Sequence, residues 1–237
     1  MVQALVTGGS RGIGRSIAAE LVRQGHDVVI TGRESSTLVE AARAIGAQPI
    51  VLDAGDTQES VRVIRALDER VPLDLVIANA GVGMPDPLAT PWAWESMKDA
   101  FHTNFCGAAA TLTAALPAMV ARARGHVVGI SSLAAFGALP AAAAYCAPKA
   151  GLDMLLDCLR IDLAKTNVAV TRVSLGFVRT KMVERSTHPM PQILDPDDVA
   201  RTIVKRLAKR PSSIVIPRAL AVVAKGISFL PAGLKAR

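Results

Sequence analysis

Short apolar runs alternate along the chain with longer segments whose apolar residues recur at helical spacing. The apolar runs predict strands over residues 2–6, 26–31, 48–52, 73–78, 125–131, 168–175 and 213–216. The segments between them predict helices that pass through residues 17–22, 38–45, 57–70, 92–120, 143–165 and 195–209. This alternation predicts an α/β fold in which right-handed crossovers join the strands of a parallel sheet.

Polar residues and prolines mark where several of these helices should begin or break. Thr57 is the predicted N-cap of its helix, and Asp195 or Asp197 caps the last one. The segment 92–120 predicts a short helix followed by a long alanine-rich one, interrupted near Pro117. Residues 181–194 contain two prolines and predict an irregular loop.

A glycine-rich loop joins the first predicted strand to the first predicted helix. Its sequence, T-G-G-S-R-G-I-G, runs from Thr7 to Gly14. Gly8 permits a tight turn, while Gly12 and Gly14 let a pyrophosphate approach the backbone N–H groups and the helix dipole. The order strand, glycine loop, helix therefore predicts a dinucleotide site, and a purely structural glycine turn is the alternative.

Basic residues stand where a dinucleotide site contacts the adenosine ribose. The second strand ends at Gly32 and Arg33, and Arg11 lies within the glycine loop. An acidic residue in this region binds the ribose 2′-hydroxyl of NAD, whereas arginine accommodates a 2′-phosphate. The two guanidinium groups favour NADP(H), and an exposed loop charge is the alternative for Arg33.

Three residues form a candidate catalytic group near the fifth strand. Tyr145 and Lys149 are spaced i and i+4, so a helix places them on one face, where the ammonium should lower the phenol pKa. Ser132 follows the apolar run at the strand's carboxyl edge and could bond the same substrate oxygen. A tyrosine and a lysine on a solvated helix face are the alternative for the pair alone.

Composition narrows the possible partners. The 237 residues suit one α/β domain, and the formal net charge of +7 with a pI near 9.8 favours an anionic partner such as a phosphorylated cofactor. One tyrosine and two tryptophans argue against a nucleic-acid stacking surface, so no nucleic-acid partner is expected. Three scattered cysteines favour a reducing, cytoplasmic setting. No metal-ligand spacing, signal peptide or transmembrane helix is expected.

Several motifs in this order resemble the short-chain dehydrogenase/reductase family over residues 1–217. They are the glycine loop, Asp53, N-A-G at Asn79, Asn104, Ser132, Y-C-A-P-K at Tyr145, and Gly176 with Thr180. The resemblance implies a single-domain, Rossmann-like, doubly wound fold with a seven-stranded parallel sheet flanked by helices. It also implies a catalytic tetrad of Asn104, Ser132, Tyr145 and Lys149. In that tetrad Tyr145 is the acid/base, Ser132 polarises the substrate oxygen, Lys149 binds the ribose, and Asn104 holds a relay water.

The same resemblance implies which residues contact the cofactor. These are Gly8, Ser10, Arg11, Gly12, Ile13, Gly14, Arg33, Asp53, Asn79, Ala80, Gly81, Tyr145, Lys149, Gly176, Val178 and Thr180. Residues 1–217 are thus expected to form the dinucleotide-binding and catalytic domain, with residues 218–237 as an apolar and basic tail. Leu175 stands where the family usually has proline, which leaves the contacts of the following loop open.

The expected function is NADPH-dependent interconversion of a carbonyl and an alcohol, a carbonyl reductase acting on a lipophilic small molecule. A non-catalytic NADP(H)-binding sensor or scaffold is the alternative. The tail carries an apolar stripe at helical spacing, so it either covers the substrate cleft or lies on a membrane surface as a peripheral contact. By resemblance, the helices that begin near Phe105 and Ala143 form a homodimer interface.

Overall fold

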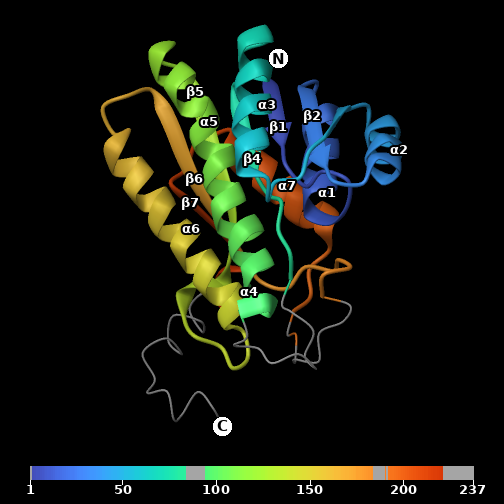
Figure 1. The fold of residues 1–237 in the computed structure, drawn as a ribbon, viewed down its shortest axis with the longest axis vertical. Coiled ribbons are helices and arrows are strands. Elements are labelled where there is room, and N and C mark those ends of the chain that lie inside the picture. The colour runs from blue at the N-terminus through green and yellow to red at the C-terminus, as the bar shows by residue number, and fades with distance from the viewer. Residues whose placement is uncertain (1, 84–93, 184–189, 191, 221–237) are drawn as a thin grey trace.

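The computed structural model describes residues 2–83, 94–183, 190 and 192–220 (Figure 1). The strands are β1 (Gln3–Val6), β2 (Asp27–Gly32), β3 (Gln48–Val51), β4 (Leu75–Ala78), β5 (Gly125–Ser132), β6 (Val168–Leu175) and β7 (Ser213–Ile216). The α-helices are α1 (Gly12–Arg23), α2 (Ser35–Ile45), α3 (Thr57–Arg70), α4 (Trp94–Phe101), α5 (Ala108–Ala121), α6 (Ala143–Asp162) and α7 (Pro196–Leu207). A π-helical turn, η1 (His102–Gly107), joins α4 to α5, and a 3₁₀ turn, η2 (Leu133–Phe136), follows β5.

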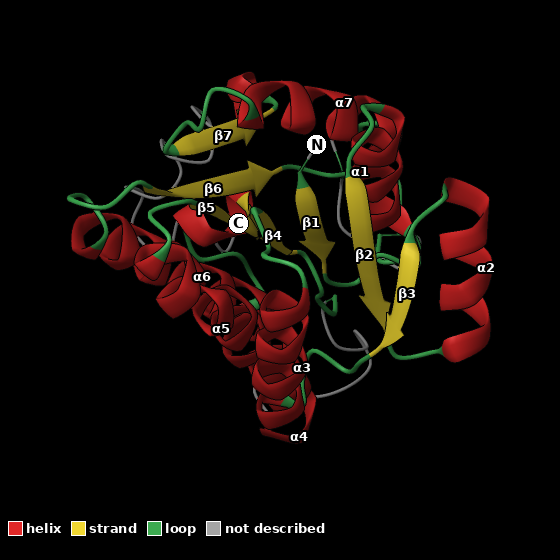
Figure 2. Cartoon of the chain, turned by 90° about the horizontal axis from the view of Figure 1, so that it is seen from above, coloured by secondary structure: helices red, strands yellow, loops and turns green. Residues whose placement is uncertain are grey.

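All seven strands belong to one parallel sheet. Their order is β3-β2-β1-β4-β5-β6-β7, so the chain winds outward from β1 in one direction and from β4 in the other. Helices α1, α2 and α7 cover one face of the sheet, and α3, α5 and α6 cover the other (Figure 2). This arrangement confirms the expected doubly wound α/β fold.

Two apolar layers hold the helices against the sheet. Ile30 and Ile77 face α1 and α7, whereas Val29 and Val76 face α3 and α5, and all four are almost fully buried. Successive residues of a strand point to opposite faces, so strands covered on both sides must be apolar throughout. This is why the apolar runs in the sequence located the strands so well.

Two local predictions about helices were wrong. The N-cap of α3 is Asp56, whose carboxylate accepts the Glu59 N–H at 3.0 Å, while Thr57 is the first helical residue. Pro117 lies inside α5 without ending it. Pro117 and Thr113 are both exposed, so water can bond the carbonyl that the missing proline N–H leaves free.

The helical stretch Met97–Ala121 is long and apolar enough to cross a membrane, although no uncharged run had indicated such a helix. More than half of its apolar window, 56%, is buried inside the protein. Leu112, Ala115 and Met119 pack in the layer between α5 and the sheet. The stretch is therefore a core helix of this fold.

An ion pair closes the amino-terminal edge of the sheet. Asp68 at the end of α3 accepts the Leu73 N–H at 2.8 Å and pairs with Arg122 at 2.8 Å. Arg122 also donates to the Leu73 carbonyl oxygen, at 2.5 Å. These contacts join α3, the turn before β4 and the end of α5 at the edge opposite the glycine loop.

Candidate active site

Thr7 and Asn79 fasten the glycine loop to the carboxyl end of β4. The Thr7 hydroxyl oxygen accepts the N–H groups of Asn79 and Ala80, at 3.1 and 3.2 Å. The Asn79 amide in turn donates to the carbonyl oxygens of Thr7 and Gly8, at 2.9 and 3.2 Å. The loop after β1 and the loop after β4 are thus one hydrogen-bonded unit at the point where the strand order reverses, where such sheets bind ligands.

Two glycines of the loop stand where a side chain would not fit, so the backbone packs closely on its neighbours. Gly8 and Gly12 have φ of +67° and +53°. A Cβ at Gly8 would lie 2.8 Å from Ala80 Cα, and one at Gly12 would lie 3.1 Å from Thr180 Cγ2. Gly12 also begins α1, whose first N–H groups are free to bind an anion. These features fit a dinucleotide.

The two arginines near the glycine loop are both exposed, and one of them has an acidic neighbour. Arg11 Nη2 lies 3.7 Å from Glu34 Oε2, and both side chains are more than half exposed. Arg33, which precedes Glu34, is also exposed. The structure therefore gives Arg11 an acidic partner that the sequence reading had not included.

Ser132, Tyr145 and Lys149 come from β5 and α6 and meet at the carboxyl edge of the sheet. Ser132 Oγ donates to the Leu175 carbonyl oxygen at 3.3 Å and accepts the Ala134 N–H at 3.1 Å. Lys149 is 5% exposed, and its ammonium donates to the Ile130 carbonyl oxygen at 2.8 Å. The same nitrogen lies 6.0 Å from the centre of the Tyr145 ring. The predicted helical face is thus present.

Burial decides the protonation of this group. It raises the pKa of the Tyr145 phenol, and a hydrogen bond with Ser132 only partly opposes the rise. The net change is upward, opposite to the expected lowering, and Lys149 is not among the groups that shift this pKa. Burial also lowers the pKa of Lys149 to about 8, so the ammonium loses its proton more readily than that of an exposed lysine. The phenol holds its proton at neutral pH.

Asn104 lies in the π-helical turn between α4 and α5. Its Oδ1 accepts the Val82 N–H at 2.8 Å, and its Nδ2 donates to the Val82 carbonyl oxygen at 3.0 Å. A Cβ at Gly81 would lie 3.0 Å from the same Oδ1, and one at Gly107 would lie 2.1 Å from the Ala54 carbonyl oxygen. The Asn104 side chain therefore orders the loop after β4.

The remaining predicted cofactor contacts lie around the same edge. Gly176 N–H donates to the Ile216 carbonyl oxygen at 2.8 Å, and Val178 pairs with Leu194 in a β-bridge just before Thr180. Asp53, after β3, accepts the Gly55 N–H at 2.9 Å. Ser10 packs on Gly32, Gly14 packs on Asn79, and Ile13 packs on the apolar layer under α1.

Sequence reasoning missed three residues around the site. Thr7 was quoted only as the start of the glycine motif, although its hydroxyl is the hub of two backbone contacts. Glu34 adjoins Arg33 and was passed over because its partner Arg11 is distant in sequence. Asp153 is spaced i+4 from Lys149 on α6, and an acid at this spacing was the available signal.

Two further expectations concern metals and the tail. The described ranges hold no group of three His, Cys, Asp or Glu side chains that could bind a metal ion. Most of the predicted tail, residues 221–237, lies outside the described residues, as does the part of the predicted loop at residues 184–189 and 191.

Comparison with family models and with other sequences agrees with this geometry. The short chain dehydrogenase model matches residues 3–191. A Myxococcus xanthus protein named as an uncharacterized oxidoreductase is 41% identical over 234 residues, covering 96% of this chain and 92% of its own. A Staphylococcus saprophyticus protein with the same kind of name is 32% identical over 220 residues, covering 89% and 92%.

Solved structures show the same similarity. A short-chain dehydrogenase from Streptomyces avermitilis superposes with a TM-score of 0.82 at 27% identity, covering 95% of this chain and 90% of its own. A serine dehydrogenase in complex with NADP⁺ superposes with a TM-score of 0.78 at 26% identity, covering 90% and 94%. The sheet order, the glycine loop and these matches together place the chain in the short-chain dehydrogenase/reductase family.

Proposed function

We propose that this chain is an NADPH-dependent oxidoreductase that interconverts a ketone or aldehyde and an alcohol on a lipophilic small molecule. The proposal rests on one observation: Ser132, Tyr145 and Lys149 lie together at the sheet edge that also carries the glycine loop. Residues 1–217 form the cofactor-binding and catalytic domain in this proposal.

In this proposal the residues of the site divide into those that bind the cofactor and those that take part in proton transfer. Gly8, Gly12 and Gly14 and the start of α1 hold the pyrophosphate of the cofactor, and Thr180 lies against Gly12. The nicotinamide, when bound, supplies or accepts the hydride. Lys149 binds the adjacent ribose, and Asn104 belongs to the proton relay through the π-helical turn.

Tyr145 carries the proton that reduction of a carbonyl requires. Burial raises the pKa of its phenol, so the phenol is protonated at neutral pH and can act as the proton donor to a carbonyl oxygen. Ser132 interacts with the Tyr145 phenol, and in this proposal both hydroxyls bond the same substrate oxygen. Proton transfer from Tyr145 is therefore the step that this chain's own residues perform.

The cofactor preference is supported by charge and by one relative. Arg11 and Arg33 are exposed cations near the end of β2, where a 2′-phosphate would lie, and Gly32 lacks the acid typical of NAD sites. The serine dehydrogenase described above is complexed with NADP⁺. Glu34 weakens this preference, because it competes with an anion for Arg11.

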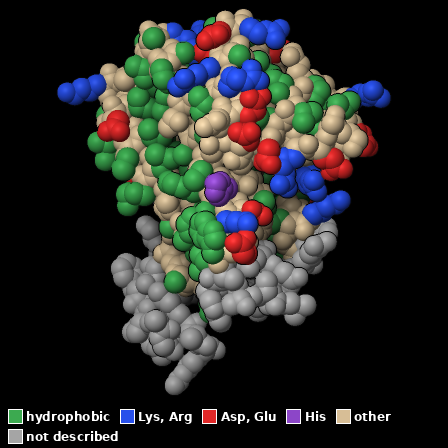
Figure 3. All heavy atoms as spheres, in the orientation of Figure 1, with side chains coloured by type: hydrophobic (Ala, Val, Ile, Leu, Met, Phe, Trp, Pro, Cys, Tyr) green, Lys and Arg blue, Asp and Glu red, His purple; other side chains and the backbone are tan. Residues whose placement is uncertain are grey.

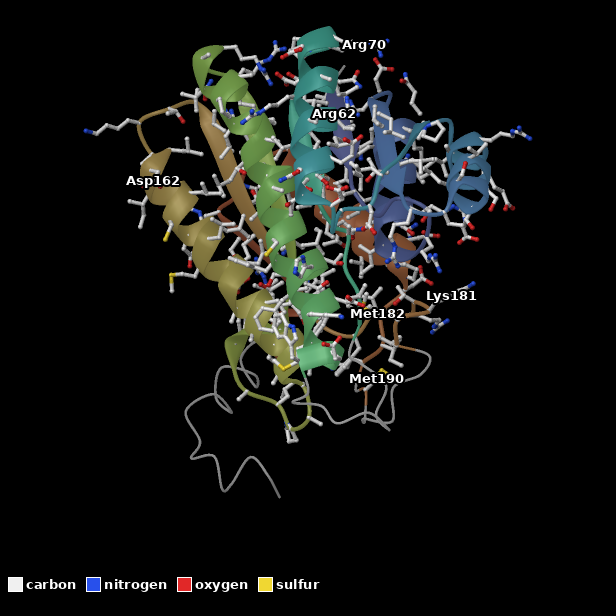
Figure 4. All side chains as sticks on the ribbon, in the orientation of Figure 1. Arg62, Arg70, Asp162, Lys181, Met182 and Met190 are labelled. Carbon is white, nitrogen blue, oxygen red and sulfur yellow. The ribbon has the colours of Figure 1, made fainter. Side chains whose placement is uncertain are left out.

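Methionines near the site support a lipophilic substrate. Met182 is 45% exposed, and a Cβ at Gly83 would lie 2.8 Å from its Cγ, so Met182 rests on the loop after β4. Met182 and Met190 lie at the same end of the molecule (Figure 4). Flexible methionine side chains adapt to varied apolar ligands.

The outer faces of α5 and α6 support the proposed homodimer. Val120, Met154 and Ile161 are 39%, 65% and 75% exposed. Apolar side chains gather over this side of the molecule (Figure 3). Exposed apolar patches of this kind commonly mark protein interfaces.

The experiment that tests the proposal is NADPH oxidation with a panel of ketones and aldehydes, comparing the parent protein with Tyr145→Phe. Phenylalanine keeps the ring and removes only the hydroxyl, so we expect a loss of turnover of about 100-fold or more while NADPH still binds. Normal turnover by the variant would refute the assignment. NADPH binding without turnover by the parent on any carbonyl would favour the sensor instead.

A further inference from the structure

A buried cluster of charges lies directly behind Lys149, between α6 and β6. Arg172 on β6 reaches two acids of α6: its Nη1 lies 3.5 Å from Asp153 Oδ2 and 3.3 Å from Asp157 Oδ2. Asp157 is also paired with Arg160, at 2.6 Å. The cluster therefore runs along one face of α6, from Lys149 through Asp153 to Asp157, and is fixed to the sheet by Arg172.

Asp153 is the member of the cluster that faces Lys149. The i, i+4 spacing puts both on one face of α6, and they are 8% and 5% exposed. Asp157 lies one turn further from Lys149, and 41% of its side chain is exposed. Asp153 Oδ1 is buried and has no hydrogen-bond partner among the described residues, whereas Oδ2 lies 3.5 Å from Arg172 Nη1.

We propose that Asp153 is a positioning residue that acts through Lys149: its buried carboxylate, one turn along α6, keeps the Lys149 side chain charged at the reaction site. This inference rests on the proposed function, because it assigns Asp153 a role through the Lys149 ammonium. Arg172 contributes to this role, since it pairs with the Asp153 carboxylate and holds it between α6 and β6.

The electrostatics agree with this assignment. Burial lowers the pKa of Lys149 to about 8, and Asp153 opposes that decrease. Burial raises the pKa of Asp153, and its neighbours Ser131, Arg172 and Lys149 oppose that increase while Asp157 adds to it. Each of the two buried charges therefore favours the charged form of the other.

Other titratable groups lie on α6 and on the elements packed against it. They are Tyr145, Cys146 and Cys158 on α6 itself, Glu95, Lys98 and Asp99 on α4, His102 and Cys106 on η1, and His126 on β5. The pKa of Lys149 responds to the charge of Asp153 and to burial, and to none of these other groups.

The test compares Asp153→Asn with Asp157→Asn in the full-length protein. Both changes remove one carboxylate charge beside Arg172, but only the first removes it beside Lys149. The readout is the Nζ resonance of Lys149 in ¹⁵N-lysine-labelled protein, assigned with Lys149→Arg and followed across pH. It reports the charge of Lys149 whether or not the protein turns over a substrate.

We expect a midpoint near about 8 in the parent and in Asp157→Asn. In Asp153→Asn the midpoint should fall by about one pH unit, the smaller end of the effect of losing a nearby opposite charge. With an active substrate, kcat at pH 8 should then fall about fivefold in Asp153→Asn, with KM for the carbonyl unchanged and little loss at pH 6.

An unchanged midpoint in Asp153→Asn would overturn the inference, as would an equal shift in both variants, because the effect would then not be specific to Asp153. If the midpoint shifts only in Asp153→Asn while the parent reduces no carbonyl, the assignment of Asp153 stands and the proposed function fails. The two ideas are therefore separable.

Discussion

Asn104 and Val82 exchange two hydrogen bonds, so a side chain from a π-helical turn completes the backbone of the loop after β4. Val82 N–H donates to Asn104 Oδ1 at 2.8 Å, and Asn104 Nδ2 donates back to the Val82 carbonyl oxygen at 3.0 Å. Asn104 is 1% exposed. The loop that carries Asn79 is therefore held at both ends, by Thr7 and by Asn104.

Replacing Asn104 should show how much its two hydrogen bonds with Val82 stabilise the protein. In Asn104→Ala the Val82 N–H and carbonyl lose their partners, so the free energy of unfolding should fall by about 1–3 kcal/mol in urea titrations. Asn104→Asp keeps an acceptor for the Val82 N–H but loses the donor, and we expect an intermediate loss. Equal stability of Asn104→Ala and the parent protein would show that the loop does not depend on this pair.

Gly12→Ala should weaken cofactor binding more than it weakens the fold. The new methyl group would lie 3.1 Å from Thr180 Cγ2 at a backbone position with φ of +53°. We expect a rise in the dissociation constant for NADPH of about tenfold or more, measured by cofactor fluorescence, because the backbone would no longer admit the pyrophosphate.

Gly25→Ala is the matched control for this variant. Gly25 also has a positive φ, +80°, but a Cβ there meets nothing within 4 Å. Both variants should lose about 1 kcal/mol of stability from backbone strain, and only Gly12→Ala should lose NADPH affinity. Loss of affinity in both would mean that strain, and not crowding of the glycine loop, is responsible.

Arg33→Asp should move the cofactor preference from NADPH towards NADH. The substitution removes a cation that would meet the 2′-phosphate and adds an acid that can bond a ribose hydroxyl. We expect the ratio of kcat/KM values for NADPH and NADH to fall about 100-fold. Arg43→Asp, at an exposed arginine of α2, makes the same change of net charge and should leave the ratio unaltered. An unaltered ratio in Arg33→Asp would remove Arg33 from the site.

His126 should make the protein sensitive to mild acid. Its Nε2 lies 2.8 Å from Thr171 Oγ1, and the Thr171 hydroxyl donates to the Pro211 carbonyl oxygen, so Nε2 carries the proton and donates to Thr171. Burial, with a smaller effect of Arg210, lowers the His126 pKa from 6.5 to about 4. The folded protein therefore keeps this imidazole neutral.

The sign of the effect follows from proton uptake. Between pH 6.5 and about 4 the unfolded chain binds a proton at His126 that the folded chain does not, so stability falls as the pH falls. The expected loss is about 3 kcal/mol over this interval in denaturant titrations. His126→Gln should flatten the slope, and His102→Gln, at an exposed histidine, should not. An unchanged slope in His126→Gln would contradict the assignment.

The strands were predictable because both faces of the sheet are covered. β6 and β7 have the predicted bounds, and β4 begins two residues later because Leu73 belongs to the preceding turn at Asp68. Helix ends were less predictable, since Asp56 and Thr57 are both good caps and only the backbone geometry decides between them. The continuation of α5 through Pro117 depends on its exposure, which no local pattern reveals.

Features of the site that depend on spacing within one motif could be predicted from the sequence. Features that depend on charged groups from different helices and strands could not. The face shared by Tyr145 and Lys149 follows from one helix. The pairing of Arg172 with Asp153 requires the packing of α6 on β6, and the raised pKa of Tyr145 requires knowledge of its burial. Local sequence carries neither kind of information.

The contacts of Asp68 and Arg122 affect how many substitutions this protein can tolerate. They fasten α3, β4 and α5 at the end of the molecule opposite the glycine loop. Substitutions that stabilise these contacts raise the free energy of unfolding far from the site. They can therefore offset the stability lost through substitutions in the substrate loops, and they leave the catalytic residues unchanged. A laboratory selection for new substrates should therefore begin from a variant that is stabilised around Asp68 and Arg122. Such a parent protein stays folded with more destabilising substitutions.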